Sequence, residues 1–320
     1  MKNVVVIGGG AGAFVVLSGI KDLSINISAI VTMMDSGGST GRLRDQYDVL
    51  PPGDIRQCLV ALSKAPDLWT KLFLYRFESG DLRGHNFGNI FLTALEKITK
   101  NYSDVADTAA FILQTKGKVI PVTFDKVHLC VEYDDGEIIE TEKLIDTAFH
   151  KKTRIKKAYL KPRAKPNQNG INAILNADYI IIGPGDLYTS LIPNFVVDDM
   201  KQALSKSRAT IINIMNLMTK RGQTPKYTAT DHITDIERYI GRKINTILIN
   251  NTPMSQEIIS YYKRRQEIPV VDDLTNGRSI IRQDLLDEDL HDKEKSDLAI
   301  RSLVRHSSVK IGSAIMEIIG

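Results

Sequence analysis

The sequence predicts an α/β fold in which a doubly wound, mainly parallel sheet lies between two layers of helices, a Rossmann-like three-layer arrangement. Two observations lead to this prediction. Short runs of β-branched residues such as Val4–Ile7 recur along the chain without alternation, which is typical of parallel strands buried on both faces. Helical patterns separate these runs, and glycine-rich loops join strand to helix.

The elements follow one another in the order that such a fold requires. "NVVVIGGGAGAFVVLSGIKDL" predicts strand, glycine turn and helix, and "INISAIVTMM" predicts a second strand, so residues 3–34 form one βαβ unit. Helices are predicted in "DIRQCLVALS", "DLWTKLFLYRF", "NFGNIFLTALEKIT" and "DVADTAAFILQT". Parallel-type strands return in "ADYIIIGPGDLYTSLIPNF", "ATIINIMNLMTKRGQT", "NTILINNTP" and "IPVVDD".

Residues 117–160 have a different pattern. "KVIPVT", "VHLCVEY" and "EIIETEK" are β-rich, and Asp135-Gly136 between the last two is a strong hairpin signal. We therefore expect one domain, residues 1–320, with a small antiparallel β insertion at about 117–160. The basic segment "HKKTRIKKAYLKPRAKP" that ends it is expected to be a solvated edge, with a phosphate-facing rim as the alternative.

Composition narrows the class of protein. The chain has 320 residues, of which 42% are hydrophobic and 25% charged, and its net charge of +4 gives no reason to expect a nucleic-acid partner. Cys58 and Cys130 lie in apolar runs, as buried thiols do in a reducing compartment. No stretch approaches the roughly 20 apolar residues of a membrane span. We expect a cytoplasmic protein, and a homodimer because two-fold dimers are the commonest assembly.

In a doubly wound sheet, ligands bind at the carboxyl ends of the strands. The first predicted strand is followed by "GGGAGA", where Gly8, Gly10 and Ala13 match the G-x-G-x-x-A fingerprint that brings a diphosphate to a helix N-terminus. The second is followed by "DSGGSTGR", a glycine-rich turn suited to an anion, with an arginine behind it. Each of these glycine turns, considered by itself, could also be an ordinary connection between a strand and a helix that binds no ligand.

Small or polar loops follow the later strands as well, which predicts one large phosphate-binding cleft. The residues expected to bind the ligand all lie in such loops or at helix starts: Gly9, Gly10, Gly12, Asp35, Gly37, Gly38, Ser39, Arg42, Asn86, Asn89, Gly183, Gly185, Ser190 and Thr219. Asp54 is either a helix cap or a carboxylate of the site. His85, beside a glycine, is expected to be structural rather than catalytic.

The motifs resemble those of a known family. "VIGGGAG", "AIVTMMDSGGSTGRLRD", "LPPGDIRQCLVALS", "GHNFGNIFLTAL", "ADYIIIGPGDLYTSLIPN", "NIMNLMTKRGQT", "TATDHI" and "LVRHSSVK" are similar, in order and nearly end to end, to the bacterial gluconeogenesis-factor (YvcK) proteins. These belong to the superfamily of the 2-phospho-L-lactate transferase, CofD. The resemblance implies a Rossmann-like fold and a cytoplasmic protein.

The resemblance implies two functions. In the bacterial branch, the resemblance implies a regulatory protein of carbon metabolism and cell shape that binds a UDP-sugar such as UDP-N-acetylglucosamine. In the transferase branch an enzyme moves a phospholactyl-type group from a nucleotide diphosphate donor to an acceptor, with Mg²⁺ held in part by Asp35 or Asp54, which would be the catalytic residues. A nicotinamide dehydrogenase, which would bind a dinucleotide, rests on the first βαβ unit alone.

Three positions depart from the family pattern. Ala11 replaces a usual threonine, Ser36 replaces the second of two aspartates, and Gln223 replaces a usual glutamate. The loss of carboxylates at two of these positions disfavours metal-dependent transfer. We therefore expect the regulatory, ligand-binding function, with the transferase as the alternative.

Overall fold

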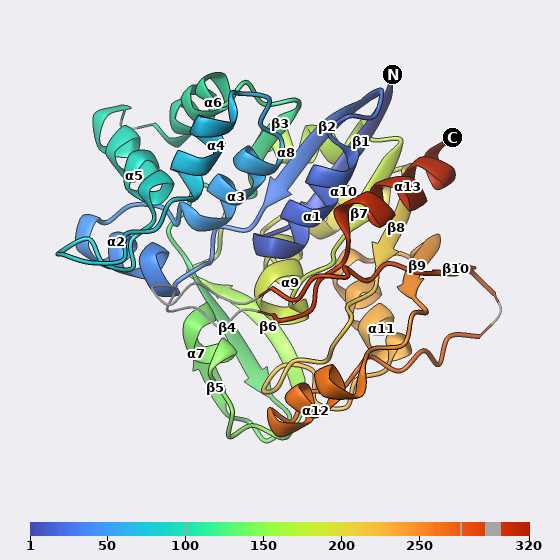
Figure 1. The fold of residues 1–320 in the computed structure, drawn as a ribbon. Helices are drawn as coiled ribbons and strands as arrows, with labels where there is room; N and C mark the ends of the chain where they lie inside the picture. Colours follow the sequence, from blue (N-terminus) through green and yellow to red (C-terminus); the bar gives the residue numbers. More distant parts are fainter. Residues whose placement is uncertain (100, 276, 292–301) are drawn as a thin grey trace.

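The computed structural model describes residues 1–99, 101–275, 277–291 and 302–320. Its main sheet has seven parallel strands in the order β10-β9-β8-β7-β1-β2-β3 (Figure 1). The strands are β1 (Lys2–Gly8), β2 (Ile25–Val31), β3 (Lys118–Pro121), β7 (Tyr179–Ile182), β8 (Thr210–Ile214), β9 (Thr246–Asn250) and β10 (Ser279–Gln283). The predicted doubly wound parallel sheet is confirmed.

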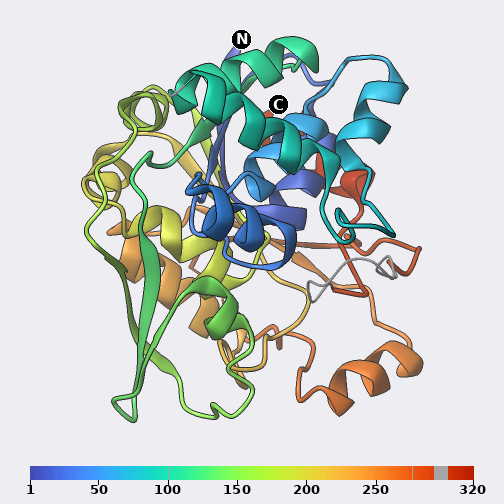
Figure 2. The ribbon, with the colours of Figure 1, turned by 90° about the vertical axis from the view of Figure 1, so that its left-hand side faces the viewer.

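Helices cover both faces of this sheet (Figures 1 and 2). One layer contains α1 (Gly10–Ile20), α3 (Gly53–Ala61) and α13 (Ser308–Ile319), with α2 (Gly38–Tyr47), α4 (Asp67–Leu74), α5 (Phe87–Thr99) and α6 (Tyr102–Ile112) beside it. The other contains α8 (Gln168–Leu175), α9 (Ile192–Phe195), α10 (Met200–Lys206) and α11 (Ala229–Ile240). Helix α12 (Gln256–Arg264) lies beyond the carboxyl ends of the strands. No helix in the described part of the chain is long and apolar enough to span a bilayer.

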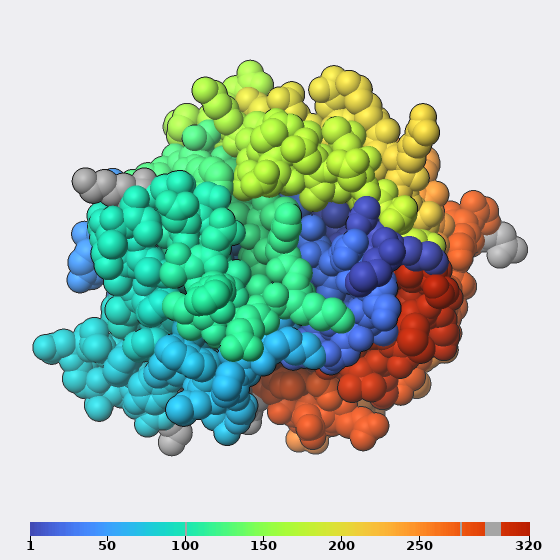
Figure 3. All heavy atoms as spheres, turned by 90° about the horizontal axis from the view of Figure 1, so that it is seen from above, coloured from blue at the N-terminus to red at the C-terminus, as the bar shows by residue number. Residues whose placement is uncertain are grey.

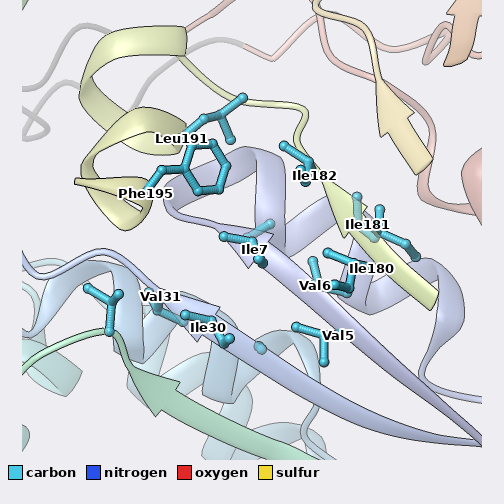
Figure 4. Packing of buried hydrophobic residues seen from close by; sticks show 14 of the residues in the cluster. Val5, Val6, Ile7, Ile30, Val31, Ile180, Ile181, Ile182, Leu191 and Phe195 are labelled. Carbon is cyan, nitrogen blue, oxygen red and sulfur yellow. The ribbon is translucent and has the colours of Figure 1, made fainter. Parts of the chain in front are cut away.

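The core is densest around the central strands. Val4–Ile7 of β1 and Ile180–Ile182 of β7 are buried, and Leu191 and Phe195 pack over them from the π-helical turn η1 (Leu187–Leu191) and α9 (Figure 4). Helices α1 and α13 meet at glycines, where a Cβ on Gly19 would lie 2.2 Å from the Ser308 carbonyl oxygen. The C-terminal helix is thereby fixed on the first helix of the fold.

A second, antiparallel sheet of three strands has the order β5-β4-β6. Its strands are β4 (His128–Tyr133), β5 (Ile138–Glu140) and β6 (Ile155–Lys161), and α7 (Glu142–Asp146) follows β5. Edge strand β6 carries part of the basic segment, and two of its lysines pair with acids of the same sheet, Lys156 with Glu132 at 2.8 Å and Lys161 with Glu140 at 3.0 Å. These pairs agree with the expectation of a solvated edge.

Two boundaries within the predicted strands need correction. Residues 118–121 of "KVIPVT" pair with β2 in the parallel sheet, so the antiparallel part begins at His128 and not near 117. The reason is that Val119 and Ile120 are apolar enough to be buried beside β2. "IPVVDD" makes only isolated bridges, at Pro269 and Val271. The last strand of the main sheet is instead "SIIRQ" at 279–283.

The strand order fixes where a ligand would bind. From β1 the chain continues to β2 and β3 on one side, and β7 then returns to the other side of β1. The carboxyl ends of β1 and β7 therefore form the topological switch point. Figure 3 shows the opposite end of the molecule from above, where α13, in red, lies beside the blue N-terminal chain.

Candidate functional site

A cavity of about 330 Å³ lies at the switch point. The loops that follow β1, β2, β7 and β8 line it, together with α7, α12 and the segment that precedes α13. Polar and apolar groups both contribute to its walls. Most of the residues expected from the sequence to bind a ligand border this one cavity: Gly9, Gly10, Gly12, Asp35, Gly37, Gly38, Ser39, Asn89, Gly185, Ser190 and Thr219, with Asp54.

The glycine turn after β1 directs the start of α1 toward the cavity. Gly9 is the N-cap residue, no side chain caps the helix, and its first turn has no acidic residue. The first backbone N–H groups of a helix carry partial positive charge and have no partner within the helix. Gly10 has a φ of +58°, which favours glycine. This helix start is therefore suited to an anionic ligand.

Gly12 has a packing role in addition to lining the cavity. A Cβ at this position would lie 1.9 Å from the carbonyl oxygen of Pro184 in the turn after β7. The two glycine turns of the switch point thus touch through their backbones. Asn216, after β8, fixes the second turn by donating to the Gly185 carbonyl at 2.7 Å.

Helix α2 presents a second start of the same kind. Its N-cap is Gly37, no side chain caps it, and the first turn again has no acidic residue. Asp35 shapes the turn by accepting a hydrogen bond from the Gly37 N–H at 2.9 Å. A Cβ at Gly53 would lie 2.6 Å from Asp35 Oδ2. The carboxylate of Asp35 therefore lies between the starts of α2 and α3.

Asp54 lies in the first turn of α3, whose N-cap residue is Pro52. It is not in the cap position that one reading of the sequence gave it. Its carboxylate lies against the first glycine turn, because a Cβ at Gly9 would be 2.3 Å from Asp54 Oδ2. Asp35 and Asp54 thus both border the cavity near the start of α3.

Ser39 and the "GHNFGN" residues form a buried network. The Ser39 hydroxyl accepts from the Asn86 N–H at 3.2 Å and from Asn89 Nδ2 at 3.3 Å, and its Oγ lies 3.2 Å from His85 Nδ1. Burial and the charges of Arg42 and Arg76 lower the pKa of His85, so its imidazole is neutral. Because both lone pairs of the Ser39 hydroxyl already accept hydrogen bonds, its O–H donates the hydrogen bond to His85 Nδ1.

Three of the expected residues do not border the cavity. Asn86 lies behind Ser39 and caps α5, where its Oδ1 accepts from the Asn89 N–H at 3.2 Å. The guanidinium of Arg42 donates to the Arg83 carbonyl at 3.0 Å. Gly183 has a φ of +78° and shapes the turn after β7. These three residues support the walls from behind.

Carboxylates that the sequence did not single out come from α7. Glu142 Oε2 accepts from the Ser36 N–H at 3.2 Å, across 106 residues of sequence. Burial, together with the charges of Asp35, Asp146 and Asp54, raises the pKa of Glu142 well above its usual range. The only sequence signal is an acidic pair four residues apart in "ETEKLID", within a segment predicted to begin as a strand.

Asp146, one turn further along α7, is held by polar neighbours. Its Oδ1 accepts from Gln223 Nε2 at 2.6 Å and from Thr189 Oγ1 at 3.1 Å. Burial, and then the charge of Asp186, raises the pKa of Asp146 to about 6, against the opposing charge of Lys220. Lys220 pairs with Asp186 at 3.2 Å. The α7 wall of the cavity is therefore rich in acid and in hydrogen-bonding groups.

The donor atoms of the cavity are compatible with a Mg²⁺ ion shared with a ligand. Within residues 1–99, 101–275, 277–291 and 302–320, no three His, Cys, Asp or Glu side chains converge closely enough to form a metal site by themselves. Mg²⁺ is commonly held by one or two carboxylates plus the phosphates of a ligand. Asp35 and Asp54 fit this second arrangement because they border the same cavity as the two helix starts.

The comparisons with known proteins identify the family. The model of the family described as 2-phospho-L-lactate transferase CofD matches residues 4–286, and the chain belongs to this family. A protein of Halalkalibacterium halodurans named gluconeogenesis factor is 38% identical over 99% of this chain and 96% of its own length. A Listeria monocytogenes protein with the same name is 37% identical over 98% of this chain and 94% of its own.

The fold is also found in a solved structure. A crystal structure of a member of the UPF0052 family from Bacillus halodurans matches with a TM-score of 0.89 and 37% identity. The match covers 99% of this chain and 100% of that chain. The resemblance inferred from the sequence motifs is thus confirmed at the level of family and fold.

Proposed function

We propose that the protein binds a nucleotide diphosphate, specifically a UDP-sugar such as UDP-N-acetylglucosamine, in the cavity at the switch point, and that it is a regulatory protein of carbon metabolism and cell shape. The observation that carries the proposal is the pair of uncapped helix starts, α1 at Gly10 and α2 at Gly38, which border one cavity. The cytoplasm and a homodimer are the proposed location and assembly.

The physical argument concerns charge. Each helix start contributes a partial charge of roughly +0.5 and several backbone N–H groups. The first turns of α1 and α2 contain neither an acidic residue nor a capping side chain of their own. The carboxylates nearest to these starts, Asp54 and Asp35, belong to neighbouring elements and would meet the phosphates through a shared Mg²⁺. A diphosphate supplies oxygen acceptors for both starts at once. The glycines at these positions let the phosphates approach the backbone closely.

Two observations favour the regulatory function over group transfer: the carboxylates available near Asp35, and the names of the relatives. Ser36, where relatives of this family often have a second aspartate, donates its N–H to Glu142 and supplies no carboxylate next to Asp35 in the sequence. Burial raises the pKa of Glu142, the carboxylate that lies near Asp35 in space, which makes it a weaker Mg²⁺ ligand than a second aspartate would be. The full-length relatives from Halalkalibacterium and Listeria are both named gluconeogenesis factors. Binding and release of an intact nucleotide sugar would let such a protein report the supply of that metabolite.

A second candidate is the CofD-like transferase, and the carboxylates on the cavity favour it. Asp35 and Asp54 would hold Mg²⁺, which when bound would neutralise charge on the diphosphate. The helix starts would orient the donor in either function. The two candidates therefore share the cavity and differ in the fate of the ligand.

The proposal is tested by calorimetric titration with UDP-N-acetylglucosamine, with and without Mg²⁺, on wild type and on Gly37→Leu. A Cβ at Gly37 meets nothing closer than 3.6 Å, so the variant fills the cavity without a backbone collision. We expect binding in wild type and its loss in Gly37→Leu. Lys157→Leu, at an exposed position of β6 that does not border the cavity, is the control and should bind normally.

Absence of binding in wild type, or equal binding by Gly37→Leu, would contradict the proposed site. Binding that requires Mg²⁺ and is followed by loss of the ligand would replace the regulator by the transferase. Light scattering measures the mass of the protein in solution and so tests the assembly. The mass of a monomer would contradict the proposed homodimer.

A further inference from the structure

The α7 wall of the cavity brings together charged side chains from four segments of the chain. Glu142, Lys143 and Asp146 come from α7, Asp186 from the turn after β7, Lys220 from the loop after β8, and Glu267 from the chain after α12. The hydroxyl-bearing residues Thr147 and Thr189 border the cavity as well. The wall therefore presents carboxylates, ammonium groups and hydroxyls to the same space.

The two lysines do not balance the carboxylates of this wall. Lys143 is exposed to solvent, where water and salt screen its charge. The side chain of Lys220 is only 14% exposed, and its Nζ lies 3.2 Å from Asp186 Oδ2. Burial lowers the pKa of Lys220, but the charges of Asp186, Asp146 and Glu267 outweigh burial and raise this pKa above its usual range. One buried cation thus faces three carboxylates, so a ligand would meet a net negative surface.

Asp146 is held in place from the protein side. Its Oδ1 accepts from Gln223 Nε2 at 2.6 Å and from Thr189 Oγ1 at 3.1 Å, and both of these side chains are buried. Glu142 forms a hydrogen bond with Asp146 from the preceding turn of α7. Asp146 is nevertheless only partly buried, and it borders the cavity. Its carboxylate is therefore oriented before a ligand arrives.

The α7 wall lies next to the start of α2. Glu142 Oε2 accepts from the Ser36 N–H at 3.2 Å, and a Cβ at Gly37, the N-cap residue of α2, would lie 3.8 Å from the same oxygen. Figure 2 shows α7, in green, beside the blue helix α2. A chemical group that is joined to a phosphate at this helix start and extends toward α7 would therefore meet the α7 wall.

We propose that the α7 wall is the subsite for the sugar of the nucleotide diphosphate, that Asp146 accepts a hydrogen bond from a sugar hydroxyl, and that the wall selects neutral sugars over sugars that carry a carboxylate. The inference rests on the proposed function, because it places the sugar of the same ligand. Hydroxyl groups form strong, charge-assisted hydrogen bonds with carboxylates. A carboxylate on the sugar would instead be repelled by like charges, which solvent screens weakly in a partly buried site.

The first test compares two ligands that differ in the charge of the sugar. In UDP-N-acetylglucosaminuronic acid, a carboxylate replaces the hydroxymethyl group of UDP-N-acetylglucosamine. Calorimetry with wild type is carried out at about pH 8, above the pKa of Asp146 of about 6, so that this carboxylate is ionised. We expect the uronic acid to bind roughly 10-fold or more weakly than the neutral sugar nucleotide. Equal or tighter binding of the uronic acid, for example through Lys143, would overturn the inference.

Asp146→Asn tests the residue itself. The amide keeps an oxygen for Gln223 and Thr189 and removes the negative charge. We expect this variant to bind UDP-N-acetylglucosamine roughly 3- to 10-fold more weakly, because a hydroxyl bonds more strongly to a carboxylate than to an amide. Its preference over the uronic acid should fall to about 3-fold or less. UDP, which has no sugar, should bind the variant no more weakly than it binds wild type.

Asp198→Asn is the matched control. It removes one negative charge from a partly exposed position that pairs with Arg163 and does not border the cavity. We expect this control to bind all three ligands as wild type does. Thermal unfolding of each variant shows that it is folded.

The outcomes separate the two proposals. If UDP-N-acetylglucosamine binds to wild type and the uronic acid binds equally well, the sugar subsite is wrong and the proposed function stands. If Asp146→Asn weakens the binding of UDP as much as that of UDP-N-acetylglucosamine, Asp146 does not act on the sugar and the inference is overturned. If no nucleotide binds to wild type, both proposals fail together.

Discussion

Replacing Gly12 with alanine tests the contact on which the geometry of the switch point depends. The added Cβ would lie 1.9 Å from the Pro184 carbonyl oxygen and 2.7 Å from the carbonyl carbon, whereas Cβ atoms essentially never come closer than 3.0 Å. The turns after β1 and β7 must therefore separate by about 1 Å. Both contacts are to backbone, so no flexible side chain can move aside.

The expected loss of stability follows from two opposing terms. Overpacking of this kind costs about 3 kcal/mol, and replacing glycine with alanine in the first turn of α1 returns at most about 1 kcal/mol, which leaves a net loss of about 2 kcal/mol or more. A loss of this size lowers the unfolding temperature by roughly 4 °C in a protein of this length. Ligand affinity should fall as well, because both displaced turns border the cavity.

Thermal unfolding followed by circular dichroism measures the effect, with Gly8→Ala, at the end of β1, as the matched control. A Cβ at Gly8 would meet only side chains, at 3.6 Å and 3.7 Å, which is ordinary contact. We expect the control to unfold within about 1 °C of wild type. The reasoning would be refuted by a Gly12→Ala variant as stable as wild type, or by a control that is equally destabilised.

Three further predictions concern the cavity. Ala11→Thr restores the hydroxyl usual in the family at the start of α1 and should tighten nucleotide binding by roughly 3- to 10-fold; unchanged affinity would place the phosphates elsewhere. Arg42→Ala should leave affinity within about two-fold in calorimetry, because Arg42 does not border the cavity, and a large loss would count against this placement. Folding raises the pKa of Asp146 to about 6, so the folded state holds the proton more tightly than the unfolded chain. The contribution of Asp146 to stability is therefore lost as the pH rises from about 4 through 6. Asp146→Asn should remove this loss, on the order of 1–2 kcal/mol, and urea unfolding with the same pH dependence in both proteins would refute it.

The parts of the fold that could be predicted from sequence are those fixed by local pattern. The apolar runs of β1 and β7 have no polar interruption, so their burial on both faces follows from composition alone. The glycine turns after them could be assigned to the cavity because the carboxyl ends of parallel strands share one edge of the sheet. Strand β10, "SIIRQ", was missed since an edge strand with exposed Ser279 and Arg282 has no continuous apolar run.

The parts of the site that the sequence did not indicate depend on contacts between distant segments. Glu142 reaches the cavity only because the antiparallel sheet folds back on the turn at Ser36. Ser39 and His85, 46 residues apart, form a pair that neither local sequence shows. His306 borders the cavity because α13 packs on α1 through Gly19. No periodicity or spacing along the chain encodes these approaches.

The central claim, that the cavity binds a nucleotide diphosphate and leaves it intact, is tested most directly by ³¹P NMR of UDP-N-acetylglucosamine with stoichiometric protein, with and without Mg²⁺. The account predicts that both phosphate resonances shift or broaden on addition of protein, return when excess UDP displaces the ligand, and show no new phosphorus species after a day. Resonances unaffected by the protein would contradict binding. A growing UMP or UDP signal would contradict a regulator that leaves its ligand intact.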